Sequence, residues 1–219
     1  MIDAKNIHKF YQKNHILNGI SLTVDKGEII SLVGASGAGK TTLLQIIGTI
    51  DSYDKKENSK LLLNNQDISG FSENQLANFR NNEIGFIFQF HQLLPEFNVL
   101  ENICIPAFIK NTPKNIAESK ANELMDYLGI SNRSKNKPSE LSGGEKQRVA
   151  VARALINEPS IILADEPSGN LDTISSNNLH ELFLGLRKDF NYTFIIATHD
   201  QLLAKKSDRV LEIIDGKIK

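Results

Sequence analysis

The sequence predicts an α/β fold, in which a mostly parallel sheet is covered by helices and carries an inserted helical subdomain. Four short apolar runs rich in Ile, Val, Leu and Phe cover residues 28–33, 84–88, 160–165 and 193–198. Parallel strands have this near-continuous apolar character because helices cover both faces of their sheet. Helical patterns lie between the runs, so crossover connections join the strands. At 219 residues the chain is long enough for one such domain.

A helical region lies between the second and third apolar runs. Its apolar residues recur at intervals of four, three and four positions before a glycine: Ala117, Ala121, Leu124, Leu128 and Gly129. This spacing predicts an amphipathic helix with a glycine stop. Prolines punctuate the region, at Pro95, Pro106, Pro113 and Pro138. We expect a helical subdomain over approximately residues 90–157, with residues 97–109 as its most apolar loop.

Two shorter segments have clear local signals. Residues 54–60 are charged and lie between apolar runs, which is typical of a solvated, strand-free turn. Near the end of the chain, the apolar residues 210–214 are separated from residues 217–219 by Asp215-Gly216. An Asp-Gly pair in this position predicts a β-hairpin with a type I′ turn.

The composition argues against a nucleic-acid-binding role. Hydrophobic residues make up 40% of the chain and charged residues 23%, values typical of soluble globular proteins. The 25 basic and 26 acidic side chains give a formal net charge of -1. No broad basic field is therefore present to hold a phosphate backbone, and we expect no nucleic acid partner.

The sequence also lacks signals for secretion or membrane insertion. The single cysteine, Cys104, cannot form an internal disulfide, and residues 1–9 contain no apolar stretch of the kind found in signal peptides. No run approaches the ~18 uninterrupted apolar residues that span a bilayer, and residues 97–109 are broken by Glu101. We expect a cytosolic protein whose contact with any membrane is indirect.

A glycine-rich loop, GASGAGKT, follows the first apolar run and precedes a predicted helix. It matches the pattern GxxxxGK[ST] in the strand, loop and helix context that makes this pattern meaningful. Its N–H groups and the positive end of the helix can surround phosphate oxygens. The lysine can contact the β- and γ-phosphates, and the threonine hydroxyl can hold Mg²⁺. We expect this phosphate cradle to comprise Gly34, Ala35, Ser36, Gly37, Ala38, Gly39, Lys40, Thr41 and Thr42.

Two acidic residues, Asp165 and Glu166, end the third apolar run. The carboxyl end of a buried strand lies beside the cradle in such sheets. Asp165 can therefore orient a magnesium shell, and Glu166 can face a water molecule. Acidic pairs at strand ends are also common in solvated turns, and it is the cradle upstream that favours a metal ligand and a base.

The segment LSGGEKQR at residues 141–148 begins a predicted helix. Ser142 and Glu145 form an S-x-x-E capping box, which by itself indicates only a helix start. The segment also resembles the LSGGQ-type signature of ATP-binding cassette (ABC) proteins, and the chain resembles the ATP-binding subunits of ABC transporters over nearly its whole length. The resemblance implies a single ABC ATP-binding domain over residues 1–219. Its fold would be that of the P-loop NTPases, with an added antiparallel β part at the N-terminus.

The resemblance implies roles for further residues. The helix start at Ser142, Gly143 and Gly144 would close on the γ-phosphate of an ATP molecule held by a second copy. Tyr11 would stack on adenine, and a packing role beside Phe10 is the alternative.

Three more positions follow in the order that the family shows. Gln89, after the second apolar run, resembles the glutamine that contacts Mg²⁺ and senses the membrane partner. Asp172, in the segment SGNLD, resembles the loop that crosses the dimer interface, and His199 stands in the place of the histidine that orients the γ-phosphate. Each would be an ordinary loop residue if it occurred alone. The implied catalytic residues are Lys40, Glu166 and His199, and the implied magnesium ligands are Thr41, Gln89 and Asp165.

Two segments narrow the resemblance. IFQFHQLLP at residues 87–95 and DEPSGNLD at residues 165–172 look like the branch that contains lipoprotein-releasing, macrolide-exporting and cell-division ATPases. Within this branch, FQFHQLLPEFNVLEN is most similar to the lipoprotein-releasing subunits. Residues 52–60 depart from the pattern because they lack its usual Pro and Gly turn. Macrolide-type export and the control of cell division remain the alternatives.

The resemblance also implies partners. A homodimer would bind Mg-ATP and drive a separate permease from the cytoplasmic side of the inner membrane, as a peripheral subunit. The segment beyond Gln89 contains three large apolar residues within five positions, namely Leu93, Leu94 and Phe97. We expect this apolar cluster to bind a short cytoplasmic helix of the permease, and the alternative is that it packs into its own subdomain.

Overall fold

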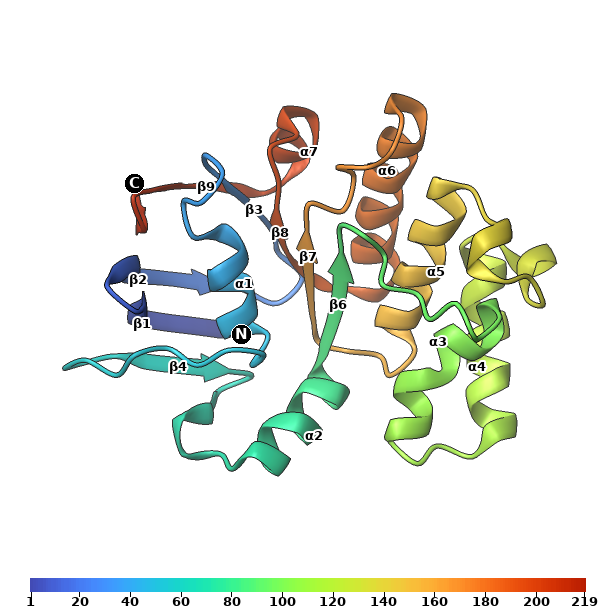
Figure 1. The fold of residues 1–219 in the computed structure, drawn as a ribbon, viewed down its shortest axis with the longest axis horizontal. Helices are drawn as coiled ribbons and strands as arrows, with labels where there is room; N and C mark the ends of the chain where they lie inside the picture. Colours follow the sequence, from blue (N-terminus) through green and yellow to red (C-terminus); the bar gives the residue numbers. More distant parts are fainter.

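Two β-sheets and seven α-helices build the fold, which a computed structural model describes for residues 1–219 (Figure 1). The strands are β1 (Ile2–Tyr11), β2 (Asn14–Val24), β3 (Ile29–Val33), β4 (Lys60–Leu63), β5 (Gln66–Asp67), β6 (Ile84–Phe88), β7 (Ile161–Asp165), β8 (Thr193–Ala197), β9 (Arg209–Ile214) and β10 (Lys217–Ile218). The helices are α1 (Lys40–Ile47), α2 (Glu73–Glu83), α3 (Val99–Ile109), α4 (Lys114–Tyr127), α5 (Gly143–Leu155), α6 (Thr173–Phe190) and α7 (Gln201–Lys206). Three short 3-10 turns are η1 (Ile68–Gly70), η2 (Ser131–Arg133) and η3 (Pro138–Glu140).

The larger sheet has six strands in the order β10-β9-β3-β8-β7-β6. The four predicted apolar runs form its neighbouring strands β3, β8, β7 and β6, which pair in parallel. Strand β9 also pairs with β3 in parallel, and only β10 is antiparallel. The carboxyl ends of the parallel strands therefore meet at one edge of the sheet, toward which β6 and β7 point in Figure 1. The predicted mostly parallel sheet is confirmed.

The smaller sheet is antiparallel and has the order β2-β1-β4-β5. It lies beside α1, on the side of the molecule opposite the helices α3 to α5 (Figure 1). This sheet confirms the antiparallel N-terminal part that the family resemblance implied.

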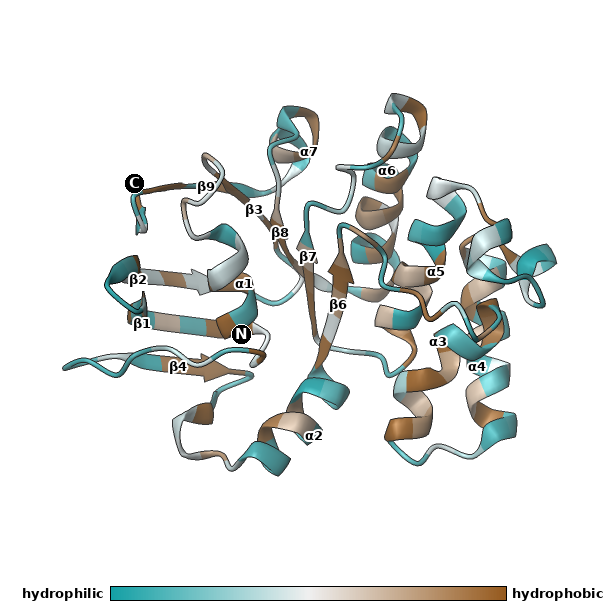
Figure 2. Cartoon of the chain, viewed as in Figure 1, coloured by the Kyte–Doolittle hydropathy of each residue, from teal (hydrophilic) through white to brown (hydrophobic).

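Alternate residues of the parallel strands face two separate cores. On β7, Ile162 and Ala164 belong to a core of 25 buried residues on the side of α3 to α6. Ile161 and Leu163 point the other way, into a core of 23 buried residues shared with α1 and the smaller sheet. Because both faces are buried, the strands are apolar at nearly every position. Figure 2 shows this as brown along β6 and β7, whereas teal lies on helices, on loops and on parts of β1 and β2.

The helices α3, α4 and α5 pack against one another beyond β6 (Figure 1). The expected loop at residues 97–109 is wrong, because α3 occupies most of it. Asn98 starts the helix by a capping box with Glu101, in which the two backbone N–H groups and side-chain oxygens are reciprocally bonded at 2.8 Å. Pro106 lies inside α3 instead of ending it. The subdomain boundaries near residues 90 and 157 remain predictions.

The predicted helix stop and hairpin are both present. Helix α4 is followed by Gly129 with φ 67°, which is the left-handed stop that the sequence indicated. Asp215 and Gly216 have φ 48° and 73°, as a type I′ turn between β9 and β10 requires.

Two other expectations concern the segment at residues 54–60 and the crossing of a membrane. The segment at residues 54–60 is not free of strand contacts, because Asp54 bridges His8 and β4 begins at Lys60. None of the helices has the length and apolar character needed to cross a membrane.

Candidate functional site

The phosphate cradle joins β3 to α1, and two of its glycines are required by the surrounding fold. Gly34 has φ 151°, and a Cβ atom there would lie 2.3 Å from the carbonyl oxygen of Ile213. Gly39 has φ 107°, and its Cβ would lie 2.7 Å from the Leu17 side chain. Residues with side chains rarely adopt these conformations. The loop can therefore curl in this way only with glycine at both positions.

The helix that follows the cradle presents uncapped N–H groups. Gly39 is the N-cap residue of α1, and no side chain accepts a hydrogen bond from the first turn. Such a helix start attracts anions through its N–H groups and the helix dipole. Lys40 Nζ donates to the carbonyl oxygens of Gly34 at 2.8 Å and Ala35 at 3.1 Å. Both acceptors are neutral, so the positive charge of this nearly buried lysine is left for an anion.

Asp165, at the end of β7, lies beside the cradle. Thr41 Oγ1 donates to Asp165 Oδ1 at 3.1 Å. Burial raises the pKa of Asp165, and the hydrogen bond from Thr41 offsets only part of this shift. A hydroxyl and a partly buried carboxylate in contact are a donor set that suits Mg²⁺, which usually takes one or two carboxylates together with phosphate oxygens. A cation at this point would also stabilise the charged form of Asp165.

Glu166 and His199 are joined across the ends of β7 and β8. Glu166 has φ 46°, a conformation that is uncommon for residues other than glycine. Its N–H donates to the carbonyl oxygen of Ala197 at 2.8 Å, which anchors this strained backbone to the next strand. Its Oε2 lies 2.8 Å from His199 Nδ1 and accepts from the His199 N–H at 3.3 Å. An acid and an imidazole are thus held together at the edge of the sheet.

These groups line one cleft of about 550 Å³. Its lining consists of Tyr11, Ile16, Gly34, Ser36, Gly37, Gly39, Lys40, Thr41, Thr42, Gln89, Asp165, Glu166 and His199. The structure therefore gathers most of the predicted site residues, from five separate segments, around one space. Ala35 and Ala38 line a neighbouring hollow, which shares Gly34, Ser36 and Gly37 with the cleft. Ile16 was not predicted, because an apolar residue in a strand carries no signal of ligand contact.

The predicted signature residues Ser142, Gly143 and Gly144 do not line this cleft. They begin α5, where Ser142 Oγ accepts from the Glu145 N–H at 3.2 Å and Glu145 Oε2 accepts from the Ser142 N–H at 2.8 Å. Asp172 also lies outside the cleft, and it caps α6 by accepting from the N–H groups of Ile174 and Ser175. The capping box at Ser142 is the helix start that the sequence predicted, whereas the helix cap that Asp172 provides was not predicted.

The segment after Gln89 is held by an arginine that sequence reasoning missed. His91 and Gln92 both have positive φ, 57° and 47°. The Arg153 guanidinium, from α5, donates to the carbonyl oxygens of Gln92 at 2.6 Å and His91 at 2.7 Å. Asn170 Nδ2 also donates to the Gln89 carbonyl oxygen at 3.1 Å. The loop that carries Gln89 is thus tied to α5 and to the segment before α6.

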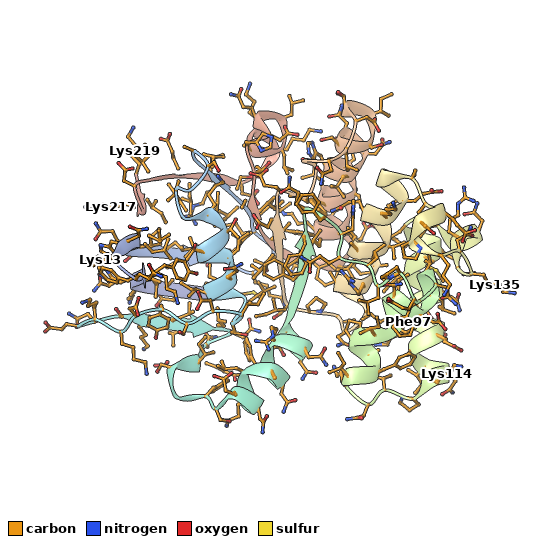
Figure 3. All side chains as sticks on the ribbon, in the orientation of Figure 1. Lys13, Phe97, Lys114, Lys135, Lys217 and Lys219 are labelled. Atoms are coloured by element: carbon orange, nitrogen blue, oxygen red, sulfur yellow. The ribbon has the colours of Figure 1, made fainter.

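The apolar cluster beyond Gln89 is only partly exposed. Leu93 packs against the larger core, whereas Leu94 and Phe97 are 43% and 41% exposed. Figure 3 shows Phe97 on the helical side of the molecule, far from the edge that bears Lys13 and Lys217. The surface expected for a partner is therefore reduced to Leu94 and Phe97.

The sequence model of the ABC transporter family matches residues 17–169. This chain belongs to the ABC transporter family. It is 53% identical over 218 residues to the lipoprotein-releasing system ATP-binding protein LolD of Bacteroides fragilis, with 100% of both chains covered. It is 52% identical over 219 residues to the protein of the same name from Bacteroides thetaiotaomicron, with 100% of this chain and 99% of the relative covered.

Solved structures of ABC cassettes have the same fold. The dimeric structure of MJ0796, a bacterial ABC transporter cassette, has a TM-score of 0.91 and 32% identity, and the match covers 100% of this chain and 97% of that one. A second dimeric structure of that cassette holds ADP and phosphate in a post-hydrolysis state, with the same TM-score, identity and coverage. ABC ATP-binding subunits hydrolyse ATP, so this ABC chain binds ATP and is an ATPase.

Proposed function

We propose that the chain is the ATP-hydrolysing subunit of a lipoprotein-releasing transporter and drives a separate permease from the cytoplasmic face of the inner membrane. The observation that carries this proposal is the 53% identity, over the full length of both chains, to a lipoprotein-releasing ATP-binding protein. The segment that follows β6 resembles that of the lipoprotein-releasing branch. It lies on the helical side of the molecule, where a partner would bind.

The chain works as a homodimer in this proposal. One copy contains a cleft with an uncapped helix start, a free lysine charge and two acids, while Ser142, Gly143 and Gly144 lie outside it. A second copy would bring its signature helix start to the phosphate end of this cleft, where its N–H groups and dipole favour an anion. Asp172, which caps the neighbouring helix, would lie at the same interface. The dimeric cassette with 32% identity supports this arrangement.

ATP would lie along the cleft from Tyr11 to the acids. Tyr11 is 42% exposed and lines the cleft, so its ring can stack on adenine. The cradle N–H groups from Gly34 to Thr42 and the Lys40 ammonium would hold the β- and γ-phosphates. Magnesium would be held by Thr41 and Asp165, with Gln89 beside them, and it would supply positive charge that neutralises the phosphate oxygens.

Hydrolysis then needs mainly positioning and charge stabilisation. Glu166 accepts a proton from the attacking water, whose oxygen forms a bond to the γ-phosphorus as the bond to the β–γ bridging oxygen breaks. His199, whose Nδ1 lies 2.8 Å from Glu166 Oε2, would orient the γ-phosphate. Lys40 and the helix start of the second copy stabilise the negative charge that develops. The products are ADP and phosphate.

The permease would bind at Leu94 and Phe97. Both are exposed apolar side chains on the segment that carries Gln89, so movement of the nucleotide-contacting glutamine can reach the membrane partner. Replacing Leu94 or Phe97 by Asp should leave a folded, ATP-binding protein that no longer co-purifies with the permease. Retained assembly and coupled transport would show that the permease binds elsewhere.

The transport role is tested by isolating the membrane partner with this chain. A permease with a periplasmic domain that binds lipoproteins, together with ATP-dependent release of lipoproteins from proteoliposomes, is the expected outcome. A partner that recruits cell-wall hydrolases would instead assign the chain to the control of cell division, and one that binds macrolides would assign it to export.

A further inference from the structure

A buried lysine lies behind the ring that we propose for adenine stacking. Lys9 and Tyr11 are two positions apart on β1 and so point to the same face of the strand. Lys9 is only 8% exposed, and a lysine buried to this degree needs a charged or polar partner. Its Nζ donates to Asp51 Oδ1 and to the Ser52 carbonyl oxygen, both at 2.6 Å. The lysine therefore fixes the Asp51 carboxylate in place.

The second oxygen of Asp51 binds the tyrosine. Tyr11 donates its hydroxyl to Asp51 Oδ2 at 2.6 Å, and the Ser52 N–H donates to Oδ1 at 2.7 Å. The hydrogen bond to Asp51 is the largest cause of a raised pKa at Tyr11. Burial raises the pKa of Asp51, but the hydrogen bonds from Lys9, Tyr11 and the Ser52 N–H, together with the Lys9 charge, outweigh burial and lower it. Asp51 is thus a charged acceptor at the end of the Tyr11 side chain.

The contacts also determine which face of the ring is open. Lys9 Nζ lies over the ring, 5.1 Å from its centroid. Tyr11 meanwhile lines the nucleotide cleft. One face of the ring is therefore covered by the lysine, and the other is left for a base.

We propose that Asp51 is a positioning residue for nucleotide binding, since its carboxylate, anchored by Lys9, holds the Tyr11 ring by the hydroxyl in the orientation that stacks on the base. This inference rests on the proposed stacking role of Tyr11. An exposed tyrosine without this bond would sample other rotamers and would lose that freedom on binding, whereas a ring held in advance binds more tightly. The expected gain in affinity is about three- to tenfold.

The test is a double-mutant cycle between Asp51→Ala and Tyr11→Phe, read by equilibrium binding of Mg-ADP to the full chain. Tyr11→Phe keeps the ring and removes the hydroxyl, and it leaves the Lys9–Asp51 pair intact. Each single change should weaken Mg-ADP binding about three- to tenfold, and Asp51→Ala should add nothing in the Tyr11→Phe chain. Tripolyphosphate, which occupies the cradle but has no base, should bind all four chains equally.

Three outcomes would overturn the proposal: unchanged Mg-ADP affinity in Tyr11→Phe, additive losses in the double variant, or an equal loss of tripolyphosphate affinity. Because Tyr11→Phe does not disturb the buried lysine, unchanged Mg-ADP affinity in this variant overturns the proposal even if Asp51→Ala fails to fold. Tyr11→Ala separates this inference from the function on which it rests. If Tyr11→Ala binds Mg-ADP normally, the stacking role itself is wrong; if it binds weakly while Tyr11→Phe binds normally, only the role of Asp51 is wrong.

Discussion

The cradle, which precedes α1, and the signature, whose Gly143 and Gly144 begin α5, both carry glycines at a helix start, but these glycines are needed for different reasons. A Cβ atom at Gly34 would meet a carbonyl oxygen at 2.3 Å, so the fold of this chain requires that glycine. A Cβ atom at Gly143 would lie 3.6 Å from Leu171, and one at Gly144 would lie 3.4 Å from Ser175. These are ordinary contacts, and neither residue has a positive φ. Nothing within the chain therefore requires glycine at the signature helix.

The two helix starts also differ in how their N–H groups are used. Helix α1 has no side-chain cap, so its first turn is open to a ligand. Helix α5 has a complete capping box between Ser142 and Glu145, so part of its first turn is already hydrogen-bonded within the chain. In a single chain, the cradle therefore has an open helix start that can bind a ligand. The signature glycines instead leave space for something that approaches from outside, which is the phosphate held by a second copy in the function proposed above.

The largest expected effect separates ATP hydrolysis from the formation of the ATP-dependent dimer. Glu166→Gln keeps the shape of the cleft but removes the base, so ATP hydrolysis in the assembled transporter should fall by ~100-fold or more. ATP binding should persist, and the variant should form a dimer that depends on ATP. Turnover assays and size measurement with and without ATP check both parts. Near-normal hydrolysis would remove Glu166 from the role of base.

The next effect tests the claim that the fold itself requires the cradle glycine. Gly34→Ala should lower the free energy of unfolding by about 2 kcal/mol or more, because the new Cβ must displace the Ile213 carbonyl and the backbone has a positive φ. Urea unfolding of the chain without nucleotide measures this. Unchanged stability in the absence of ligand would show that the cradle glycine, like the signature glycines, is required only by what binds.

The matching change at the start of α5 should reduce ATP hydrolysis without reducing stability. Gly144→Ala should leave stability equal or raise it by up to about 1 kcal/mol, because alanine favours a helix. ATP hydrolysis in the assembled transporter should nevertheless fall roughly 10- to 100-fold, because a methyl group would displace the second copy from the phosphate. Unfolding and turnover are measured on the same preparation. A loss of stability would show that the fold of the chain itself requires this glycine.

The smallest effect concerns the capping box of α5. The hydrogen bond from the Ser142 N–H, followed by that from Arg133, lowers the pKa of Glu145 below its ordinary value. A depressed pKa stabilises the folded chain at neutral pH, and the contribution is lost as pH falls through the folded-state value. Glu145→Gln should therefore cost about 0.3–1 kcal/mol at neutral pH and nothing once the carboxyl is protonated. An unfolding difference that does not change with pH would contradict this.

The sequence by itself determined the elements that have local signals. The strands β3, β6, β7 and β8 are apolar at nearly every position because both of their faces are buried, and this is visible without coordinates. The strand, loop and helix that contain the cradle, the Ser142 capping box and the Asp215-Gly216 turn are each encoded within a few neighbouring residues, which is why they were predicted correctly. The motif order then identified Gln89 and His199, which line the cleft, together with Ser142 and Asp172, which do not.

The tertiary structure alone decided which side chains meet across the fold. Tyr11 and Asp51 are 40 positions apart, and Arg153 reaches Gln92 across 61 positions. No periodicity or spacing in the sequence predicts that such residues are in contact, because the contact arises only when separate elements pack. The same limit explains why Leu93 could not be distinguished from Leu94 along the chain. The direction of a side chain in an irregular segment is decided by its neighbours in space and not by its neighbours in sequence.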